Sequence, residues 1–345
     1  MRGSRILAAD EGALRSLQGP IGQRLHVGRH PGDYSSKLKL TLKPKQRSDK
    51  AVRRILRHLF GNIEANVDGV LDDSDVEFLH DLRVAVRRTR SALSQLKDVL
   101  PQTTVEEFRP EFIWLGTVTG PCRDLDVNLL EMDGFKSMLG IVDDSLDPLQ
   151  KLLERIRKTE HRKVVRSLRS ARFQRLVDGW GEFLETGGAA EPEPSDAARS
   201  IVELGGKRIL KAYLRVVNRG NKLDGDPPAE ALHRLRIDAK KLRYLLEFFA
   251  SLYPPKTVSP LIRELKRLQD ILGVINDMEI QRARLAELAD QLIAAGEARS
   301  ETVFAMGHLA DAMADRQEEY RHAFSKRFAS FADADSRRLY RKTFV

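Results

Sequence analysis

Cysteine is almost missing from this sequence of 345 residues, and aromatic side chains and long apolar runs are scarce. The single cysteine, Cys122, excludes an intrachain disulfide and any cysteine-rich metal site. No apolar run reaches the ~18–20 residues that a membrane helix needs. The first residues contain no apolar segment with a cleavage site after it. These absences predict a protein of a reducing cytoplasm with no membrane partner.

Negative charge is also in deficit, but only at one end of the chain. The sequence has 59 lysines and arginines against 50 aspartates and glutamates, a net charge of +9. Residues 1–50 hold 11 of the basic and 4 of the acidic side chains, so the rest of the chain is almost balanced. A polyanion site in the body of the protein must therefore depend on how the charges are arranged.

After a basic start, the sequence has the periodicity of helices. Residues 1–45 are rich in Gly, Pro, Lys and Arg and predict a mobile basic arm, with a short strand at Lys37–Lys43. From Ser48 onward apolar residues recur at helical spacing, so the predicted class is all-α. Gly and Pro mark 186–195 as a linker, and 336–345 is expected to be a basic tail. Helices are expected at about 48–70, 75–100, 104–119, 124–140, 145–185, 197–218, 229–253, 258–273, 277–295 and 299–330.

One segment of the chain is repeated 153 residues further on. The segment His80–Arg90 reappears as His233–Arg243, in the common pattern H-x-L-R-[VI]-x-x-[RK]-[RK]-x-R. Because this register holds over about 47 residues, we predict two related helical bundles, at about 46–185 and 196–335. The same offset pairs Leu115 with Leu268, Gly120 with Gly273, Arg123 with Asn276, Asp124 with Asp277 and Asp126 with Glu279.

Each copy of the repeat places basic side chains on one face of its helix. At 100° per residue, the basic residues of the first copy project within a stripe about 80° wide, and an apolar face lies roughly 120° away. We call the two sets the cationic stripes: His80, Arg83, Arg87 and Arg90, widened by Arg88, and His233, Arg236, Lys240 and Arg243, widened by Lys241. The apolar faces contain Leu82, Val86, Leu93 and Leu96 in the first copy, and Leu235, Leu242, Leu246 and Phe249 in the second.

Crowded like charges require a partner of opposite charge. Stacked cations at i,i+4 destabilise an isolated helix by ~0.2–0.5 kcal/mol per pair. The partner is either an external anion, which the duplication favours, or internal, with the candidates Asp81, Asp124, Asp126, Asp277 and Glu279. Other basic residues could line the same surface or be ordinary exposed charges: Arg53, Arg54, Arg57, Arg123, Arg162, Arg169, Arg172, Lys207, Arg208 and Lys211.

The stripe motif, followed about 30 residues later by G-x-x-[RN]-D, resembles the conserved histidine α-helical domain (CHAD) family. The second motif is present at Gly120–Asp124 and Gly273–Asp277, and the resemblance covers roughly residues 48–335. It implies two four-helix bundles related by a pseudo-twofold axis around a basic central groove or pore. It also implies binding of inorganic polyphosphate, for which the stripes are the candidate site. Some members locate to polyphosphate granules, where granule-associated proteins would be further partners.

A second domain found in some relatives is not expected here. Those relatives carry a CYTH triphosphate tunnel domain before the helical domain, and its chemistry depends on an E-x-E-x-K strand. That motif is missing from this sequence, and residues 1–45 are too short for the barrel. Triphosphatase activity by this route is therefore not expected.

The residues themselves leave three other functions open. Sequence-independent nucleic-acid binding is one, although Tyr244 alone among the aromatics interleaves the stripes. Metal binding is another, but none of the eight histidines is in an H-E-x-x-H pattern, and arginines beside His80 would repel a cation. Phosphate hydrolysis is the third, by the carboxylates of Asp124, Asp126, Asp277 and Glu279. Because no nucleophile–base constellation and no Gly-x4-Gly-Lys loop is visible, we expect no enzyme, no metal and no cofactor.

Overall fold

The structure, a computed structural model, describes residues 38, 40–140, 144–188, 193–223 and 227–345. These residues are mostly helical and form no β-strand, so the predicted all-α class is confirmed. Most of the predicted arm lies outside the described residues, and its described part, which includes 40–43, forms no strand.

The helices before the predicted linker are α2 (Ser48–Leu71), α3 (Val76–Gln95), α4 (Gln102–Val118), α5 (Gly120–Leu130), α6 (Met132–Leu139), α7 (Asp147–Leu168) and α8 (Ala171–Thr186). Those after it are α9 (Ile201–Gly220), α10 (Ala229–Phe249), α11 (Pro255–Ala294), α12 (Ser300–Phe331) and α13 (Ala334–Phe344). Short 3-10 turns follow α3 and α10, namely η2 (Lys97–Val99) and η3 (Ala250–Leu252).

Corresponding helices begin at the offset of the sequence repeat. α2 and α9 begin at Ser48 and Ile201, which are 153 residues apart. The same difference separates the starts of α3 and α10, of α4 and α11, and of α7 and α12. The repeat therefore extends beyond the stripe motif to the starts of four pairs of helices.

The expected break between residues 273 and 277 is absent, because α11 runs through it as one helix. A glycine inside a helix costs about 1 kcal/mol relative to alanine, and Gly273 carries that cost. Leu272 and Ile275 are buried on either side of it, so packing outweighs the cost.

Two other expected helices are divided. The stretch 145–185 breaks at Arg169, and Ser170 caps α8 by accepting a hydrogen bond from the backbone N–H of Phe173. The stretch 124–140 is divided at Glu131, between α5 and α6.

The expected tail at 336–345 is largely the helix α13. Asp333 caps its start by accepting a hydrogen bond from the N–H of Ser336. Tyr340 and Phe344 are buried, and the ring of Tyr340 stacks on that of Tyr213 in α9, with 3.7 Å between centroids. Although this segment is rich in basic residues, its apolar side chains lie on one face of α13, and that face packs on α9.

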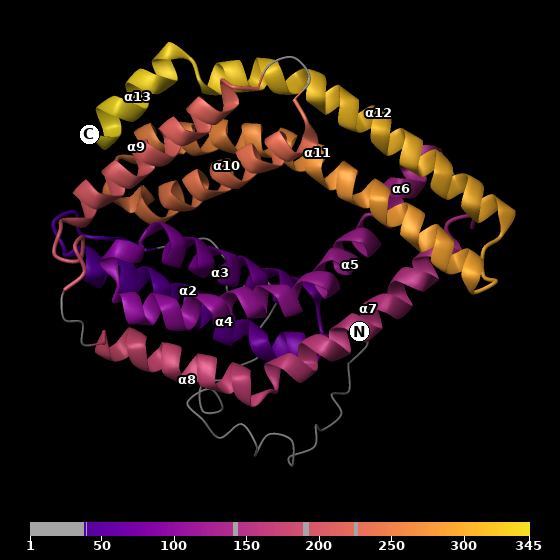
Figure 1. Cartoon of the computed structure of the whole chain (residues 1–345), viewed down its shortest axis with the longest axis horizontal. Coiled ribbons are helices and arrows are strands. Elements are labelled where there is room, and N and C mark those ends of the chain that lie inside the picture. The colour runs from indigo at the N-terminus through magenta and orange to yellow at the C-terminus, as the bar shows by residue number, and fades with distance from the viewer. Residues whose placement is uncertain (1–37, 39, 141–143, 189–192, 224–226) are drawn as a thin grey trace, which may run out of the picture.

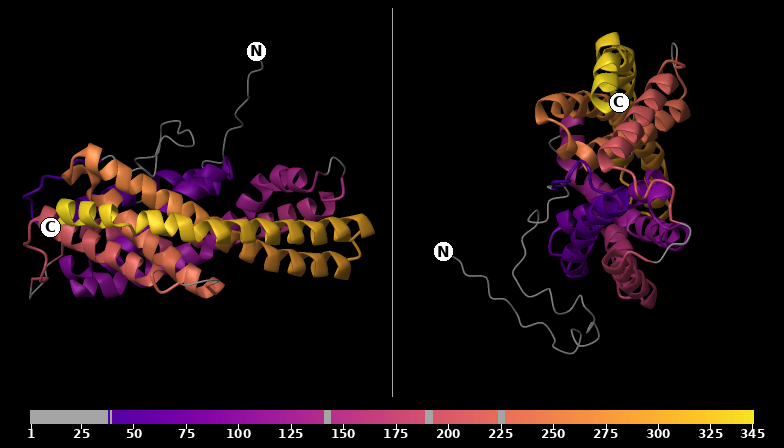
Figure 2. Two further views of the ribbon diagram at one scale, coloured as in Figure 1. Left: turned by 90° about the horizontal axis from the view of Figure 1, so that it is seen from above. Right: turned by 90° about the vertical axis from the view of Figure 1, so that its left-hand side faces the viewer.

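The stripe helices α3 and α10 lie side by side at the centre of the molecule (Figure 1). α2 and α4 pack on α3, and α9 packs on α10. Seen from above, α11 and α12 run together as an extended pair (Figure 2). The helices that carry the repeated motif are therefore inner helices, with other helices packed around them.

Among the described residues, buried apolar side chains form two clusters, and each cluster contains residues from both halves of the sequence. The smaller joins α5, α6 and α7 to α11 and α12 through side chains such as Phe135, Leu285 and Met313. The larger includes Trp180 and all eight residues predicted for the apolar faces of the stripe helices. The segments 46–185 and 196–335 therefore share their cores.

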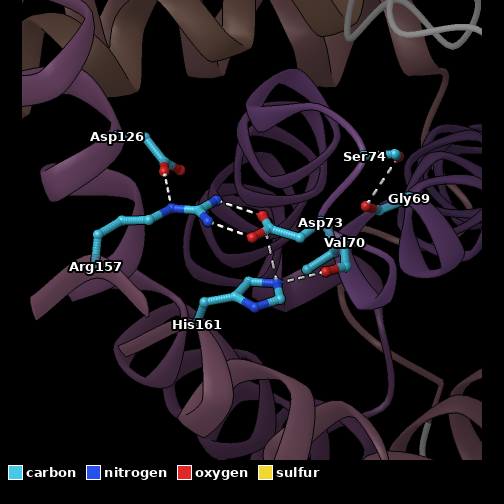
Figure 3. A network of polar contacts seen from close by, with 7 residues as sticks. All are labelled: Gly69, Val70, Asp73, Ser74, Asp126, Arg157 and His161. Atoms are coloured by element: carbon cyan, nitrogen blue, oxygen red, sulfur yellow. Dashed lines mark hydrogen bonds and ion pairs between the residues drawn. The ribbon is translucent and has the colours of Figure 1, made fainter. Parts of the chain in front are cut away.

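A polar network fixes α5 relative to α2 and α7 (Figure 3). Arg157 of α7 donates to Asp126 of α5 at 2.8 Å and, through both terminal nitrogens, to the carboxylate of Asp73 just after α2. His161 Nε2 lies 2.7 Å from the carbonyl oxygen of Val70. Arg157 holds the pKa of Asp73 below its usual range. The network anchors the helix that also carries Arg123 and Asp124.

Candidate functional site

The two cationic stripes meet where α3 and α10 pack against each other. Gln95 of α3 donates to the backbone oxygen of Lys241 at 3.2 Å, and Arg88 donates to Glu247 of α10 at 2.6 Å. Burial lowers the pKa of Lys240 to about 8, and the charges of Arg236 and of Arg87 lower it further. Because Arg87 belongs to the first stripe and Lys240 to the second, positive charge of both stripes converges on one place.

In the first stripe, Arg83 is held against α4. Its Nη1 donates to the carbonyl oxygen of Gly116 at 2.8 Å and to Thr119 Oγ1 at 2.9 Å. Burial lowers the pKa of Arg83 to about 10, with further repulsion from Arg87. Arg87 itself makes no hydrogen bond or ion pair with the described residues. Arg83 is thus fixed in place, while Arg87 keeps its donors available.

Arg90 lies over the same glycine. A Cβ on Gly116 would come 2.8 Å from Arg90 Nη1, so a larger residue there would displace the guanidinium. Burial lowers the pKa of Arg90, and the charges of Arg109 and Arg87 add to that effect. The absence of a side chain at 116 therefore lets Arg90 pack on α4.

The two histidines have different surroundings. His80 is 35% exposed and its Nε2 is 4.0 Å from Glu77. Burial, followed by the charge of Arg123, lowers the pKa of His80. His233 is exposed, and its Nδ1 lies 2.5 Å from the Oδ1 of Asn276. Both histidines lie beside the G-x-x-[RN]-D motif of their own half, because Arg123 and Asn276 are its fourth residues.

The second stripe is partly neutralised by acidic groups. Arg236 donates to Asp277 at 3.1 Å. Arg243 is 3.5 Å from Glu247 and lies over the ring of Tyr244 at 5.6 Å. Glu247 also takes the bond from Arg88, so one carboxylate serves two arginines.

Internal acids account for only part of the stripe charge. Of the five predicted internal partners, Asp277 alone forms an ion pair with a stripe residue among the described residues. Asp126 is taken by Arg157, and Glu279 accepts from Gln317. Glu247 is the main acidic group between the stripes and was not among the predicted partners. Its i+4 spacing from Arg243 is typical of an ion pair on one helix face and could have predicted this contact.

Several guanidinium N–H groups of the site are buried and have no hydrogen-bond acceptor among the residues that the structure describes. Such a group costs about 1–3 kcal/mol when it stays unsatisfied. The atoms are Arg83 Nε, Arg88 Nε and Nη1, Arg123 Nη1, Arg236 Nε and Arg243 Nε. Their concentration around the stripes means that the site can accept oxygen atoms, from water or from an anion.

The other predicted basic residues divide into three groups. Arg123 lies at the stripes, because its charge acts on His80 and Arg83. Arg162, Arg169, Lys207 and Lys211 are exposed and lie on or next to α7 and α9, not on the stripe helices, and the last two line a separate groove on α9. The remaining residues contact other parts of the chain: Arg53 lies against Gly187, Arg54 donates to the Thr41 carbonyl, Arg57 to Glu185, Arg172 to Glu111, and Arg208 to Asp98 and Asp196.

One group of side chains could supply ligands to a metal ion. Ligand atoms of Glu77, His80 and Asp81 lie within 4.8 Å of one another, the one such group found among the described residues. The charges of Arg123, Arg87 and Arg83 act on His80 at the same place and oppose a cation. The prediction of no bound metal is therefore kept.

Known proteins resemble this chain over most of its length. A family model described as the CHAD domain matches residues 54–286. Two uncharacterized proteins from two strains of Mycobacterium tuberculosis are each 28% identical over 253 residues, 70% of this chain and 46% of the relative. This chain thus spans less than half the length of those curated relatives.

Two solved structures share the fold. The crystal structure of the CHAD domain from the plant Ricinus communis is 30% identical, with a TM-score of 0.69 over 88% of this chain and 98% of that one. PptA from Streptomyces chartreusis is 18% identical, with a TM-score of 0.64 over 82% of this chain and 99% of that one. Among the described helices, none has both the length and the apolar character needed to cross a bilayer.

Proposed function

The chain belongs to the CHAD family, and from this premise we propose that it binds inorganic polyphosphate between its two cationic stripes. The observation that carries the proposal is the convergence of Arg87, Arg236 and Lys240, which contributes to lowering the pKa of Lys240 to about 8. Such crowding is unfavourable unless an anion relieves it. The buried guanidinium N–H groups nearby supply donors for its oxygens.

Polyphosphate suits this arrangement because its charges repeat along a flexible chain. Arginine offers a planar fork of donors that matches phosphate oxygens, and lysine acts as a point charge. A chain with a charge on every unit can contact both stripes at once and releases counterions as it binds. We propose that the two halves are related by a pseudo-twofold axis and line a shared basic groove, which the 153-residue spacing of the helix starts supports.

The proposed role is binding without catalysis, in the cytoplasm and at polyphosphate granules. Nucleic acid is the alternative polyanion, and Tyr244 argues against it. Its side chain is buried, lies under Arg243 and stacks on Phe248 at 6.4 Å between centroids. It is therefore a poor platform for stacking bases.

A salt titration tests the proposal. The affinities for long polyphosphate, single-stranded DNA and double-stranded DNA are measured at equal charge concentration over a range of salt. We expect polyphosphate to bind most tightly, with log affinity falling steeply against log salt. Equal or tighter binding of either DNA at physiological salt would replace the proposal with the nucleic-acid alternative.

Lys240 gives the proposed binding a defined pH dependence. In the free protein burial lowers its pKa to about 8, and Arg236, Arg87 and Arg243 repel its charge while Asp277 favours it. A bound polyanion favours the charged form and raises this pKa. Above about pH 8 binding must then be accompanied by proton uptake, so the affinity falls as pH rises from 8 toward 10, and it is insensitive to this group below 8.

Calorimetry in buffers of different ionisation enthalpy measures this uptake. At pH 8.5 to 9 we expect the parent to take up a substantial fraction of one proton when polyphosphate binds. Lys240→Arg should remove most of that uptake and keep the affinity at high pH. If the parent takes up no proton, Lys240 does not face the bound chain.

We also predict that the purified protein carries no stoichiometric transition metal. Glu77, His80 and Asp81 are close enough to chelate, but Arg123 and Arg87 repel a cation at His80. Elemental analysis of tag-free protein should show far less than one zinc, iron or copper per chain. About one bound metal that is lost in a His80→Ala variant would contradict this prediction.

A further inference from the structure

A second basic surface runs along α9 and is separate from the stripes. It is a groove of about 1070 Å³ between α9, Tyr253 after η3, and the end of α13. None of the ten stripe residues lines it. We call it the α9 groove.

Most of the basic side chains in the α9 groove have no ion-pair partner in the part of the chain that the structure describes. Lys207, Lys211, Arg215 and Lys222 line it, are exposed and form no ion pair with the described residues. At 100° per residue they fall within about 80° of one another, and they span about 22 Å of helix. Glu203 is the only acidic side chain among the lining residues.

Apolar and aromatic side chains form another part of the lining. Leu210 and Leu214 are half-buried and lie one turn apart on α9. The ring of Tyr253 meets that of Phe344 edge-on, with 4.9 Å between centroids, and its hydroxyl donates to the carbonyl oxygen of Val202 at 3.2 Å. The groove therefore combines an apolar floor with a cationic rim.

The two halves of the repeat differ at this face of α9. Arg57 of α2 is the position 153 residues before Leu210, and it contacts Glu185 and the carbonyl of Leu184 in α8. In the first half, α8 thus contacts the position that corresponds to Leu210, although Arg57 itself stays exposed. In the second half, α13 contacts α9 at Gly206 instead, where an added Cβ would come 2.7 Å from the Phe344 carbonyl oxygen.

We propose that the α9 groove docks an acidic amphipathic α-helix of a partner protein. A helix lays apolar side chains at i and i+4 into such a groove, and its carboxylates would pair with the cations along the rim. A rim of about 22 Å corresponds to a helix of about 15 residues. Polyphosphate has no apolar group for the floor, so the groove fits an acidic helix better. The inference does not depend on polyphosphate binding at the stripes.

The test uses the full chain and a panel of fluorescent helical peptides of that length. Their leucines are spaced at i, i+4, i+7 and i+11 among glutamates and alanines, in several registers. We expect the best member to bind with a dissociation constant below about 100 μM. Replacing its leucines by serine, or its glutamates by lysine, should weaken binding at least about tenfold, because the floor and the rim both contribute.

Two charge-matched variants locate the binding. Lys211→Glu with Arg215→Glu should weaken the peptide at least about tenfold and leave polyphosphate affinity within about threefold. Lys158→Glu with Arg162→Glu, exposed and also one turn apart on α7, makes the same change in net charge and should leave the peptide affinity unchanged.

Three results would overturn the proposal. One is that no peptide binds below about 1 mM. Another is that the serine peptide binds as well as its parent, because the apolar floor is then unused. The last is that Lys211→Glu with Arg215→Glu weakens polyphosphate as strongly as the peptide, which would make the groove part of a polyphosphate site.

Discussion

Reversing Arg87 and Lys240 to glutamate together should weaken binding of long polyphosphate by at least tenfold, roughly the effect of losing two phosphate contacts. Each stripe loses one cation and gains one anion where the stripes converge. Neither residue forms an ion pair among the described residues, so the folded state loses no such contact and is relieved of like-charge repulsion. The slope of log affinity against log salt should fall by about 1–2, because fewer counterions are released.

The single variants and the chain length show whether the stripes form one site. A long chain that contacts both stripes makes its second contact intramolecularly, so either single reversal should weaken it markedly. A polyphosphate chain too short to contact both stripes should lose affinity mainly in the variant whose reversal lies in the stripe that it contacts. Lys158→Glu with Arg162→Glu serves again as the charge-matched control. Should the double variant, folded by circular dichroism, bind long polyphosphate with the affinity and salt slope of the parent, the stripes are not the site.

The parts of this fold that could be predicted are those encoded by nearby residues. Helical class and the apolar faces follow from spacing within a few turns, and Leu82 and Leu242 are fully buried as expected. The continuity of α11 could not be predicted, because Gly273 is a poor helix former and its packed neighbours come from elsewhere in the chain. Predicting α13 required knowing that Tyr340 has Tyr213 to stack on.

The candidate site shows the same division. The spacing of Arg83, Arg87 and Arg90 places them on one helix face, and the structure keeps them together on α3. Which charges outside the repeat reach that face depends on tertiary contacts. Arg57 and Arg172 were equally plausible from sequence, yet each pairs with a glutamate elsewhere. In the helical projection Arg88 lies at the edge of the first stripe, but in the structure α10 packs over it and buries it.

The buried pair of Arg88 and Glu247 should be the most costly single contact to break between the halves. The side chains are 8% and 22% exposed and meet at 2.6 Å, while Nε and Nη1 of Arg88 have no acceptor in the described part of the chain. Glu247→Leu leaves that buried guanidinium without its counterion. Since removing one partner of a buried pair costs about 3–5 kcal/mol and Glu247 is partly exposed, we expect a loss of about 2–4 kcal/mol in the free energy of unfolding. Urea denaturation at neutral pH measures it.

Further variants distinguish the cost of an unpaired buried charge from the cost of lost packing in Glu247→Leu. If an unpaired buried charge is the cause, Arg88→Met combined with Glu247→Leu should recover much of the stability, because an apolar pair needs no counterion. Glu287→Leu removes the partner of Arg284 in an exposed pair and should change the free energy of unfolding by less than about 1 kcal/mol. A double variant no more stable than Glu247→Leu would mean that the pair is not what joins α3 to α10. The apolar faces around Leu93 and Leu246 would then hold the two stripe helices together.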